Sequence, residues 1–483
     1  MFMVFRHHVS VAAFTAMMAD MVLCFVAIVL AAGTLEGTRS NYPLQVYQVV
    51  LTGAQFALII SLMYSFAGLY RPTPIALPAK LVRTVIALVV GSYLTYLMLL
   101  IVAEPEYVKL LIGSALMYSL VGVIFVRSGL YFLRHVATQR RVLIVGTGPE
   151  AYAVAGDLKA LKRASNDVIG FYPTSDETRP GDTHLSHLSI RDSQMGSLDG
   201  PGPVPSPKVF SREASIEELV ERHRIDEIIV AEREQRGGGV PMDQLLACRI
   251  RGIPVLDLAA FYERAKSEVP IDSLKASWLV YGHGFVQGRA RQIAKRAFDI
   301  LCSSILLLLA SPVMLLTILA IKLDSPGPII YRQERVGLGG RIFMCLKFRS
   351  MRTDAEKDGV ARWAAKNDSR ITRIGAFIRK TRIDELPQLL SVLKGEMSLV
   401  GPRPERPSFV AQLKEQIPFY DVRHSVKPGV TGWAQVRYSY GASLEDARRK
   451  HQFDLYYVKN NSLFLDLLVL IETVSVVLFR EGQ

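Results

Sequence analysis

The chain has 483 residues, of which half are hydrophobic, and a formal net charge of +13 at pH 7. This length allows more than one domain, and an apolar chain with excess positive charge is typical of a membrane protein with basic cytoplasmic parts. Nucleic acid is not expected as a partner, because no zinc-finger spacing, basic zipper or aromatic RNA-binding run occurs. The cysteines form no CxxC pair and predict neither a zinc site nor a disulfide framework.

The first third of the chain is predicted to lie in a membrane. It contains four apolar stretches, 11–32, 45–69, 82–103 and 109–132. Each is close to the ~20 residues that a spanning helix requires. Positive residues gather in the loops on one side of these stretches, so both ends of this bundle, residues 1–135, are expected to face the cytoplasm. Asp20 lies inside the first stretch and predicts either an ion pathway or an ion pair with a neighbouring helix.

Residues 136–265 have the pattern of a small α/β domain. The predicted strands are 142–145, 168–171, 227–230 and 253–256. One predicted helix follows the first strand and ends near 162, and two more span 214–224 and 241–250. Alternating strands and helices predict a parallel, doubly wound, Rossmann-like sheet. The stretch 173–207 is rich in Pro, Gly, Ser and Asp and predicts a loop or an insertion.

Gly146 and Gly148 begin a GxGxxA motif that follows the first predicted strand and precedes a helix. This context is typical of a nucleotide-binding loop. The acid expected at the end of the second strand is missing, because Phe171-Tyr172-Pro173 stands there. The motif therefore leaves two interpretations open: a nucleotide loop, or a scaffold or regulatory domain whose glycines only shape a tight turn.

Tyr262 and Lys266 form a YxxxK motif, whose tyrosine and lysine act together as the catalytic base in short-chain dehydrogenases. This pair offers an alternative function, a membrane-attached sugar-nucleotide dehydratase or epimerase built on the middle domain. The incomplete cofactor motif speaks against it.

A predicted linker, 266–290, leads to the last part of the chain, 291–483. This part begins with an apolar run, 297–321, that Ser311-Pro312 interrupts. Proline removes a backbone hydrogen bond and clashes with the preceding turn, and basic residues flank both ends of the run. We expect a re-entrant helix–break–helix whose ends both face the cytoplasm, with the Ser311 hydroxyl bonding a freed carbonyl. The alternative is an ordinary kinked span.

A last apolar run, 462–479, carries Asp466 and Glu472. A spanning helix does not carry such acids without partners. We expect an interfacial helix, or a helix docked on the preceding domain.

Asp384 and Glu385 stand side by side among basic residues, in the run from Arg379 to Gln388. Adjacent acids suit a site where one attacks or takes a proton while the other holds a divalent cation. Arg379 lies five residues before Asp384, so the two would face different sides of one continuous helix. A break at 381–383 would bring both to one site.

Several motifs occur in order over about 290–480. They are Lys347-Phe-Arg-Ser-Met351, Arg379 with Asp384-Glu385-Leu-Pro-Gln388, the run from Lys394 to Gly401-Pro-Arg-Pro404, and the run from Lys427 to Gln435. This set resembles the bacterial sugar transferase family, the monotopic polyprenyl-phosphate phosphoglycosyl transferases. The membrane stretches and the α/β domain ahead of it resemble the long, exopolysaccharide-type members.

The resemblance implies transfer of a sugar-1-phosphate from a UDP-sugar, UDP-glucose or UDP-galactose, to undecaprenyl phosphate, with release of UMP. This reaction would be the first membrane step of exopolysaccharide or O-antigen-type synthesis. The protein would lie in the bacterial inner membrane, in contact with its lipid, with the catalytic domain on the cytoplasmic face, and as a homodimer. A non-enzymatic scaffold for polysaccharide assembly is a further alternative.

The resemblance also assigns roles to residues. Asp384 would be the nucleophile that forms an aspartyl-phosphosugar intermediate, and Glu385 would hold Mg²⁺; a rival mechanism makes Asp384 a general base only. Substrate phosphates would be bound by Lys347, Arg379, Arg403 and Arg423, with Pro402 and Pro404 fixing the backbone around Arg403 and Asp454 as a further candidate.

Overall fold

The computed structural model describes residues 2–479 apart from short gaps. The gaps are 5–6, 10, 37–44, 71–76, 102, 137–139, 161–165, 175–207, 233–238, 272–273, 275–278, 280–283, 286, 356–367, 369, 439–440 and 442. Most of the predicted insertion 173–207 therefore lies outside the described residues. The chain divides into two compact units, of which one is essentially Gly129–Lys266 and the other holds the N-terminal helices and the C-terminal part. The domain boundaries at 135, 265 and 290 stay a prediction.

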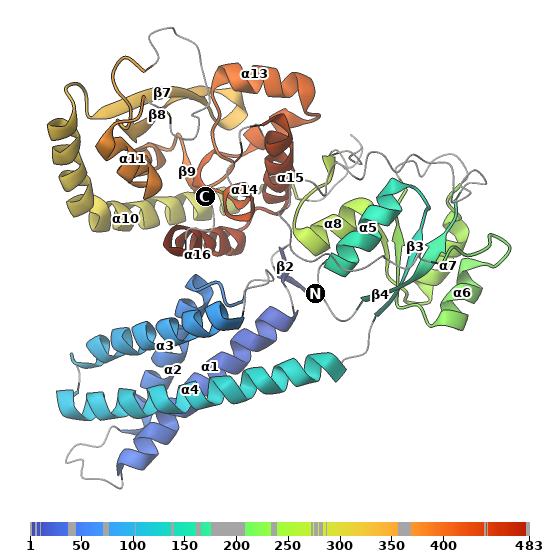
Figure 1. Ribbon diagram of the computed structural model, residues 1–483, viewed down its shortest axis with the longest axis horizontal. Helices are drawn as coiled ribbons and strands as arrows, with labels where there is room; N and C mark the ends of the chain where they lie inside the picture. The colour runs from blue at the N-terminus through green and yellow to red at the C-terminus, as the bar shows by residue number, and fades with distance from the viewer. Residues whose placement is uncertain are drawn as a thin grey trace. The chain divides into compact units, whose positions relative to one another are not determined.

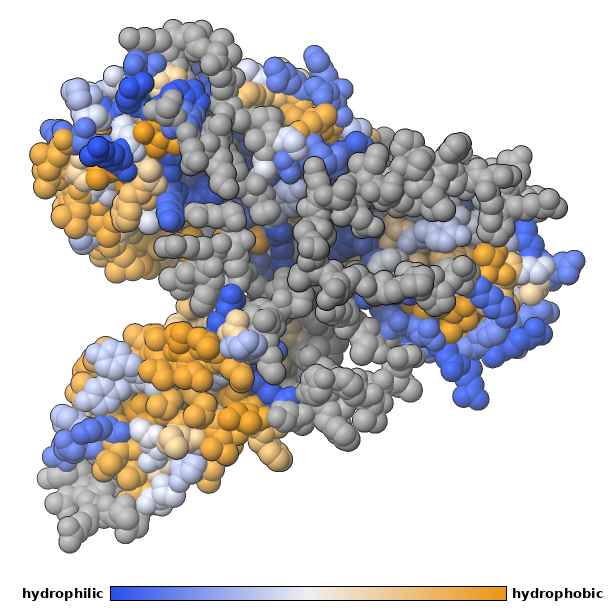
Figure 2. All heavy atoms as spheres, viewed as in Figure 1, coloured by the Kyte–Doolittle hydropathy of each residue, from blue (hydrophilic) through white to orange (hydrophobic). Residues whose placement is uncertain are grey.

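Long apolar helices form the N-terminal part (Figure 1). After a short hairpin of β1 (Phe2–Val4) and β2 (His7–Val9) come α1 (Val11–Glu36), α2 (Val46–Phe66), α3 (Leu77–Leu99) and α4 (Pro105–Val136). Together with α10 (Arg289–Asp324), these are the five helices of the described part that are long and apolar enough to cross a membrane. Hydrophobic side chains cover much of the visible face of this part (Figure 2), as expected for a membrane protein.

Asp20 is buried within this helical part and has partners on α4 and in the turn that follows α2. Its Oδ2 accepts a hydrogen bond of 2.9 Å from the Tyr70 hydroxyl and lies 3.3 Å from a guanidinium nitrogen of Arg127. Arg127 also donates to the hydroxyl of Thr84. Of the two interpretations of Asp20, pairing with a neighbouring helix is the one that these contacts support.

The unit 129–266 contains a four-stranded parallel sheet. Its strands, in the spatial order β4-β3-β5-β6, are β4 (Asn166–Tyr172), β3 (Arg140–Val145), β5 (Glu227–Val230) and β6 (Val255–Asp257). Its helices are α5 (Pro149–Ala160), α6 (Ile216–His223), α7 (Met242–Ile250) and α8 (Leu258–Lys266). The predicted parallel sheet is confirmed, whereas its Rossmann-like character stays a prediction.

Buried residues on both faces of this sheet explain the unbroken apolar run of β3. Leu143 packs with Ile216 and Leu245 of α6 and α7. Its neighbour Ile144 packs with Val154 of α5 and Phe261 of α8 on the opposite face. Because successive strand residues point to opposite faces, a strand covered on both sides needs apolar residues throughout.

The C-terminal part is mixed α/β (Figure 1). After α10 come the antiparallel hairpin of β7 (Ile330–Val336) and β8 (Ile342–Phe348), and the parallel pair of β9 (Ser398–Val400) and β10 (Gly429–Thr431). The helices are α11 (Arg373–Lys380), α12 (Gln388–Lys394), α13 (Pro407–Gln416), α14 (Trp433–Arg437), α15 (Leu444–Asn460) and α16 (Leu463–Phe479). The short 3-10 turns are η4 (Leu338–Gly340), η5 (Ile383–Glu385) and η6 (Tyr420–Ser425).

The predicted break at Ser311-Pro312 is not an unwound segment. α10 stays helical over all 36 residues with Pro312 inside it, and Figure 1 shows the helix changing direction within its length. Pro312 has no N–H for the carbonyl of Leu308, four residues earlier. The Ser311 hydroxyl donates to that same carbonyl at 2.7 Å, as the sequence predicted, so the helix bends without opening. A re-entrant course stays a prediction.

The two acids of α16 have basic partners elsewhere in the C-terminal part. Asp466 lies 2.8 Å from the ammonium group of Lys295, in the first turns of α10, and Glu472 lies 2.7 Å from the guanidinium of Arg437. α16 is therefore docked on this domain, which was one of the two predicted alternatives. Arg296 of α10 donates to two carbonyls at the end of α12, those of Val392 and Leu393. Lys295 and Arg296, which precede the apolar run of α10, thus link this helix to α16 and α12.

Candidate functional site

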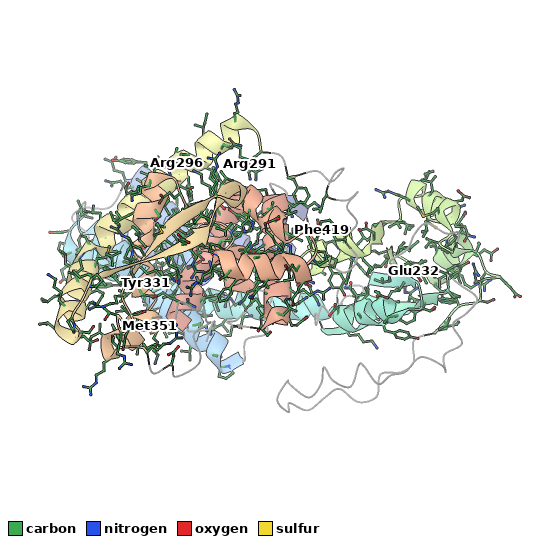
Figure 3. The ribbon with its side chains drawn as sticks, turned by 90° about the horizontal axis from the view of Figure 1, so that it is seen from above. Glu232, Arg291, Arg296, Tyr331, Met351 and Phe419 are labelled. Carbon is green, nitrogen blue, oxygen red and sulfur yellow. The ribbon has the colours of Figure 1, made fainter. Side chains whose placement is uncertain are left out.

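A cavity of about 800 Å³ opens in the C-terminal part and includes both Asp384 and Glu385 in its wall. Its lining comes from β7, β8, α11, η5, the loop after β9, α13, η6, α14, α15 and α16. Figure 3 shows two of its lining residues, Tyr331 and Met351, well separated from Phe419, which adjoins the lining residue Tyr420.

The acidic pair follows a helix that ends abruptly. α11 begins after Thr372, which caps it by accepting from the Gly375 N–H, and ends at Lys380. Arg382 then takes a left-handed backbone conformation, with φ of 59°, and η5 carries the pair. The predicted break between 381 and 383 is confirmed. It places Asp384 and Glu385, each 8 % exposed, and the half-buried Arg379 on the same cavity wall.

A close approach of α11 to the end of β8 brings Lys347 to this wall. A Cβ atom on Gly375 would overlap the backbone of Ser350, so only glycine allows this packing. Lys347 lies near the end of β8 and its ammonium group is 2.9 Å from Glu385 Oε1. The motif of Lys347 and the motif of Glu385, which are separate in the sequence, are therefore in contact at the cavity.

Glu385 is held by two cations. Besides the contact with Lys347, its Oε1 accepts from the Arg403 guanidinium at 2.7 Å, and Oε2 lies 3.4 Å from the same group. Burial acts to raise the pKa of Glu385, but the charges of Arg403 and Lys347 outweigh it and hold the pKa well below its usual range. Glu385 is therefore ionised at neutral pH.

Asp384 is in the opposite situation. Its Oδ1 is buried and has no hydrogen-bond partner among the described residues. Burial raises its pKa, and the neighbouring charge of Glu385 raises it further. A buried carboxylate oxygen without a partner is rare in folded proteins and marks a group that a substrate can use.

Arg403 is positioned by the loop that follows β9. The Gly401 N–H donates to the Thr431 carbonyl, and the Pro402 carbonyl accepts from Gly429, each at 3.0 Å. The Pro404 carbonyl accepts from Arg335 at 2.8 Å. With the backbone held on both sides, Arg403 points to Glu385 and also donates to the Gln435 side chain at 2.8 Å.

β9 itself is tied to α10. Asp299 accepts from the hydroxyl of Ser398 at 3.0 Å and from the Leu399 N–H at 3.2 Å. Lys295 donates to the Val400 carbonyl at 3.2 Å. The loop that carries Arg403 is thus built on the first turns of the apolar helix.

Arg423 and Asp454 lie at the cavity wall as a buried ion pair. Their side chains are 2.8 Å apart, and Arg423 also donates to the Arg403 carbonyl at 2.8 Å and to the Tyr420 hydroxyl. Burial raises the pKa of Asp454 to about 6, although Arg423 acts to lower it. Most donors of Arg423 are therefore used within the protein, and it supports Arg403 from behind.

Two other residues of the cavity wall were not assigned a role from the sequence. Gln435 occurs in a recognised motif, yet nothing in the pattern shows that it accepts from Arg403. Arg349 lies in the run that starts at Lys347, and it donates to the carbonyls of Ser325 and Pro326, just after α10. Arg349 therefore fixes the chain where it leaves the apolar helix.

The acidic pair fits a divalent cation only in the presence of substrate. In the part of the chain that the structure describes, no group of three His, Cys, Asp or Glu residues gathers around one point. Mg²⁺ commonly takes one or two carboxylates and fills its remaining positions with phosphate oxygens and water. Glu385, with the unpartnered Oδ1 of Asp384 beside it, fits that use.

Gly146 and Gly148 belong to the other compact unit. Gly146 has a φ of 120°, and a Cβ on it would lie 3.2 Å from the Ala231 carbonyl, so the turn itself requires glycine. A Cβ on Gly148 would meet only the Glu150 side chain. These contacts favour the tight-turn interpretation for Gly146, and nucleotide binding stays a prediction.

Lys266 of the YxxxK pair contacts an acid and the face of the tyrosine ring. The Lys266 ammonium group lies 2.8 Å from an Asp157 carboxylate oxygen and 5.3 Å from the centre of the Tyr262 ring, over its face. A dehydrogenase base would need the lysine near the tyrosine hydroxyl. The geometry therefore gives the dehydratase or epimerase alternative no support.

Known proteins resemble this chain over its C-terminal part and beyond. A family model described as bacterial sugar transferase matches residues 290–480. An undecaprenyl-phosphate glucose phosphotransferase of Komagataeibacter xylinus is 33 % identical over 409 residues, which cover 81 % of this chain and 70 % of that protein.

Two further relatives match shorter regions. The UDP-N-acetylgalactosamine-undecaprenyl-phosphate N-acetylgalactosaminephosphotransferase of Aeromonas hydrophila is 44 % identical over 54 % of this chain and 60 % of its own length. The UDP-glucose:undecaprenyl-phosphate glucose-1-phosphate transferase of Escherichia coli is 44 % identical over 38 % of this chain and 40 % of its own length. The chain thus spans less than two thirds of both proteins.

Proposed function

This chain belongs to the bacterial sugar transferase family, and from that membership we propose that it transfers a sugar-1-phosphate from a UDP-sugar to undecaprenyl phosphate, releasing UMP. The family resemblance of the sequence motifs is confirmed by the matches to known proteins. The names of the relatives, which act on undecaprenyl phosphate, support the lipid acceptor.

The observation that carries the proposed chemistry is the unpartnered Oδ1 of Asp384 beside a clamped Glu385. Asp384 attacks the phosphorus that bears the sugar, a P–O bond forms, and the bond to UMP breaks. A phosphate oxygen of the acceptor then attacks the same phosphorus. The bond to Asp384 breaks, so that the free carboxylate and a lipid diphosphate sugar result.

The cations around the acids stabilise the charge of the reacting phosphates. Arg403 offers a planar guanidinium that suits two phosphate oxygens, and Lys347 supplies a point charge. Arg379 lines the same cavity. Arg423 contributes through its hold on the Arg403 carbonyl. Such preorganised donors are often the largest part of catalysis in phosphoryl transfer.

Glu385 and the substrate diphosphate would hold Mg²⁺, with Asp384 next to them. When bound, the cation would neutralise part of the diphosphate charge. Glu385 is ionised without it, because Lys347 and Arg403 already stabilise the carboxylate. Lys347 and Arg403 therefore hold the pKa of Glu385 low, whereas burial and the charge of Glu385 raise the pKa of Asp384.

The membrane arrangement is part of the proposal. We place the C-terminal part on the cytoplasmic face of the inner membrane, where UDP-sugars are available, with α10 entering and leaving the bilayer on that face. Basic residues at both ends of its apolar run and the bend at Pro312 support this course. UDP-glucose and UDP-galactose are the first donors to test, since relatives are named for glucose, galactose and N-acetylgalactosamine. A homodimer stays a prediction.

The direct test uses membranes that contain the full chain, a panel of radiolabelled UDP-sugars, Mg²⁺ and undecaprenyl phosphate. We expect label to move to the lipid with release of UMP, and Asp384→Asn to abolish both. The exposed residue Glu415 on α13 provides a matched control, and Glu415→Gln should keep full activity. Absence of transfer from any donor by folded protein would contradict the proposal and favour a scaffold.

A second measurement separates nucleophile from general base. If Asp384 is the nucleophile, the enzyme releases about one equivalent of UMP per site before acceptor is added. If Asp384 is only a general base for direct attack, UMP appears only with the acceptor.

A further inference from the structure

We propose that Arg382, at the outer side of the acidic pair, receives the phosphate of the lipid acceptor, while Lys347 and Arg403 on the inner side serve the UDP-sugar. This inference rests on the proposed function and divides its single cavity between two substrates. Four observations lead to it: the position of α10, the surface of α11, the place of Arg382 around Glu385, and its backbone conformation.

The acceptor can reach the cavity only from the side of the membrane-embedded helix, because its polyprenyl tail stays in the bilayer. In the C-terminal part that the structure describes, α10 is the helix long and apolar enough to enter a membrane. Its second half packs on the wall of the acidic pair: Ile321 lies in one core cluster with Phe348 of β8 and Ile378 of α11. The wall formed by α11 and η5 is therefore packed against the second half of α10.

The surface of α11 is suited to the phosphate end of a lipid. Phe377 is 60 % exposed, and the next turn brings Arg379 and Lys380, which both line the cavity. Aromatic side chains beside cations are typical of membrane interfaces, where the ring meets acyl chains and the cation meets phosphate. This combination continues directly into Arg382.

Arg382 is the outer cation around Glu385. Its guanidinium is 4.0 Å from Glu385 Oε1, whereas Lys347 and Arg403 approach that oxygen to 2.9 and 2.7 Å. Its side chain is 48 % exposed, against 19 % and 32 % for the other two. Arg382 can therefore turn to an arriving phosphate while the inner cations stay on Glu385.

The backbone gives no reason for an arginine at this position. With φ of 59°, Arg382 adopts the left-handed conformation that glycine takes without strain and that costs other residues about 1 kcal/mol. The left-handed turn lets the chain leave α11, but the turn does not require the positive charge of Arg382. Charge and conformation can therefore be tested separately.

The experiment compares the full chain carrying Arg382→Gln, Arg382→Lys or Arg382→Gly with Arg373→Gln. Arg373 is an exposed arginine at the start of the same helix and does not line the cavity. We expect Arg382→Gln and Arg382→Gly to raise the KM for undecaprenyl phosphate roughly tenfold or more, as for a lost charge-assisted hydrogen bond. The KM for the UDP-sugar should stay within about twofold.

Arg382→Lys should recover part of the acceptor affinity, and Arg373→Gln should behave as wild type. A rise in the donor KM alone would assign Arg382 to the UDP-sugar and overturn the inference. Unchanged values for both substrates would also overturn it. Failure of the wild type to transfer any sugar would instead contradict the proposed function, so the two failures are distinguishable.

Discussion

The acids of the cavity and the acids that join α10 to β9 and α16 are similarly buried, but they differ in their partners. Asp466 has Tyr457 on one oxygen at 2.7 Å and Lys295 on the other at 2.8 Å. Asp384, next to the clamped Glu385, keeps one oxygen without a partner among the described residues. Burial alone therefore does not distinguish Asp384 from Asp466, whereas the unfilled hydrogen-bonding position of Asp384 does. Asp454, at the same cavity, likewise keeps its Oδ1 without a partner among the described residues.

The two clusters are also connected. Lys295 donates to the carbonyl of Val400, the last residue of β9, and three residues later Arg403 reaches into the cavity. The saturated cluster thus provides the rigid support on which the reactive cluster is placed, as precise positioning of phosphate-binding groups requires.

The largest effect is expected from Glu385→Gln. It removes the anion between Lys347 and Arg403, and we expect kcat to fall by roughly 10²–10³-fold, as for loss of an electrostatic catalytic group. Because the charge of Glu385 raises the pKa of Asp384, the variant should ionise Asp384 at lower pH. The acid limb of the pH–rate profile should therefore move down; an unchanged limb would show that the two acids are not coupled.

In the supporting cluster the expected effect is on stability. Asp466→Leu removes the nearer carboxylate of Lys295 and leaves it with Asp299 at 3.8 Å and the Val400 carbonyl at 3.2 Å. It should reduce the free energy of unfolding by about 3 kcal/mol. Lys295→Met with Asp466→Leu should recover part of this loss, because the close pair of buried charges is gone while Asp299 keeps its bonds from Ser398 and Leu399. Thermal unfolding in detergent measures both, and a double variant as unstable as the single one would contradict the assigned pair.

Asp454 should produce a smaller effect that depends on pH. Burial raises its pKa to about 6, while Arg423 and Lys450 act to lower it and Glu405 to raise it. As the pH falls through 6, Asp454 becomes protonated and its hold on Arg423 weakens. We expect a loss of roughly 1 kcal/mol, or about fivefold in rate, as for one weakened hydrogen bond.

Asp454→Asn should lack this component near pH 6 and keep only the acid limb of Asp384. A wild-type profile and a variant profile of the same shape would show that Asp454 does not titrate in the active protein. The comparison is made at saturating concentrations of both substrates, so that kcat is measured.

The smallest effect is expected at the bend of α10. Ser311→Ala leaves the Leu308 carbonyl without the hydroxyl donor and should cost about 1 kcal/mol or less. In a Pro312→Ala background the restored N–H can donate to that carbonyl, so Ser311→Ala should cost almost nothing. An equal cost in both backgrounds, measured by thermal unfolding, would contradict the compensation between Ser311 and Pro312.

Local patterns of the sequence predicted much of the secondary structure. The apolar run of β3, the four N-terminal helices and the turn at 381–383 depend on residues close in the chain, and the structure has all of them. The acidic pair and Arg403 were recognisable as motifs for the same reason. The predicted helix–break–helix at Pro312 is one continuous helix instead, with the predicted bond from the Ser311 hydroxyl to a freed carbonyl.

Only the tertiary structure decided how the charged residues are used. Glu385 meets Lys347 from 38 residues away and Arg403 from 18, and Lys295 meets Asp466 from 171. It also decided that Arg423 supports Arg403, and that α16 is docked by its acids. A sequence shows which charges exist, but their roles depend on partners that only folding brings within hydrogen-bonding distance, since electrostatic and hydrogen-bond energies fall steeply with separation.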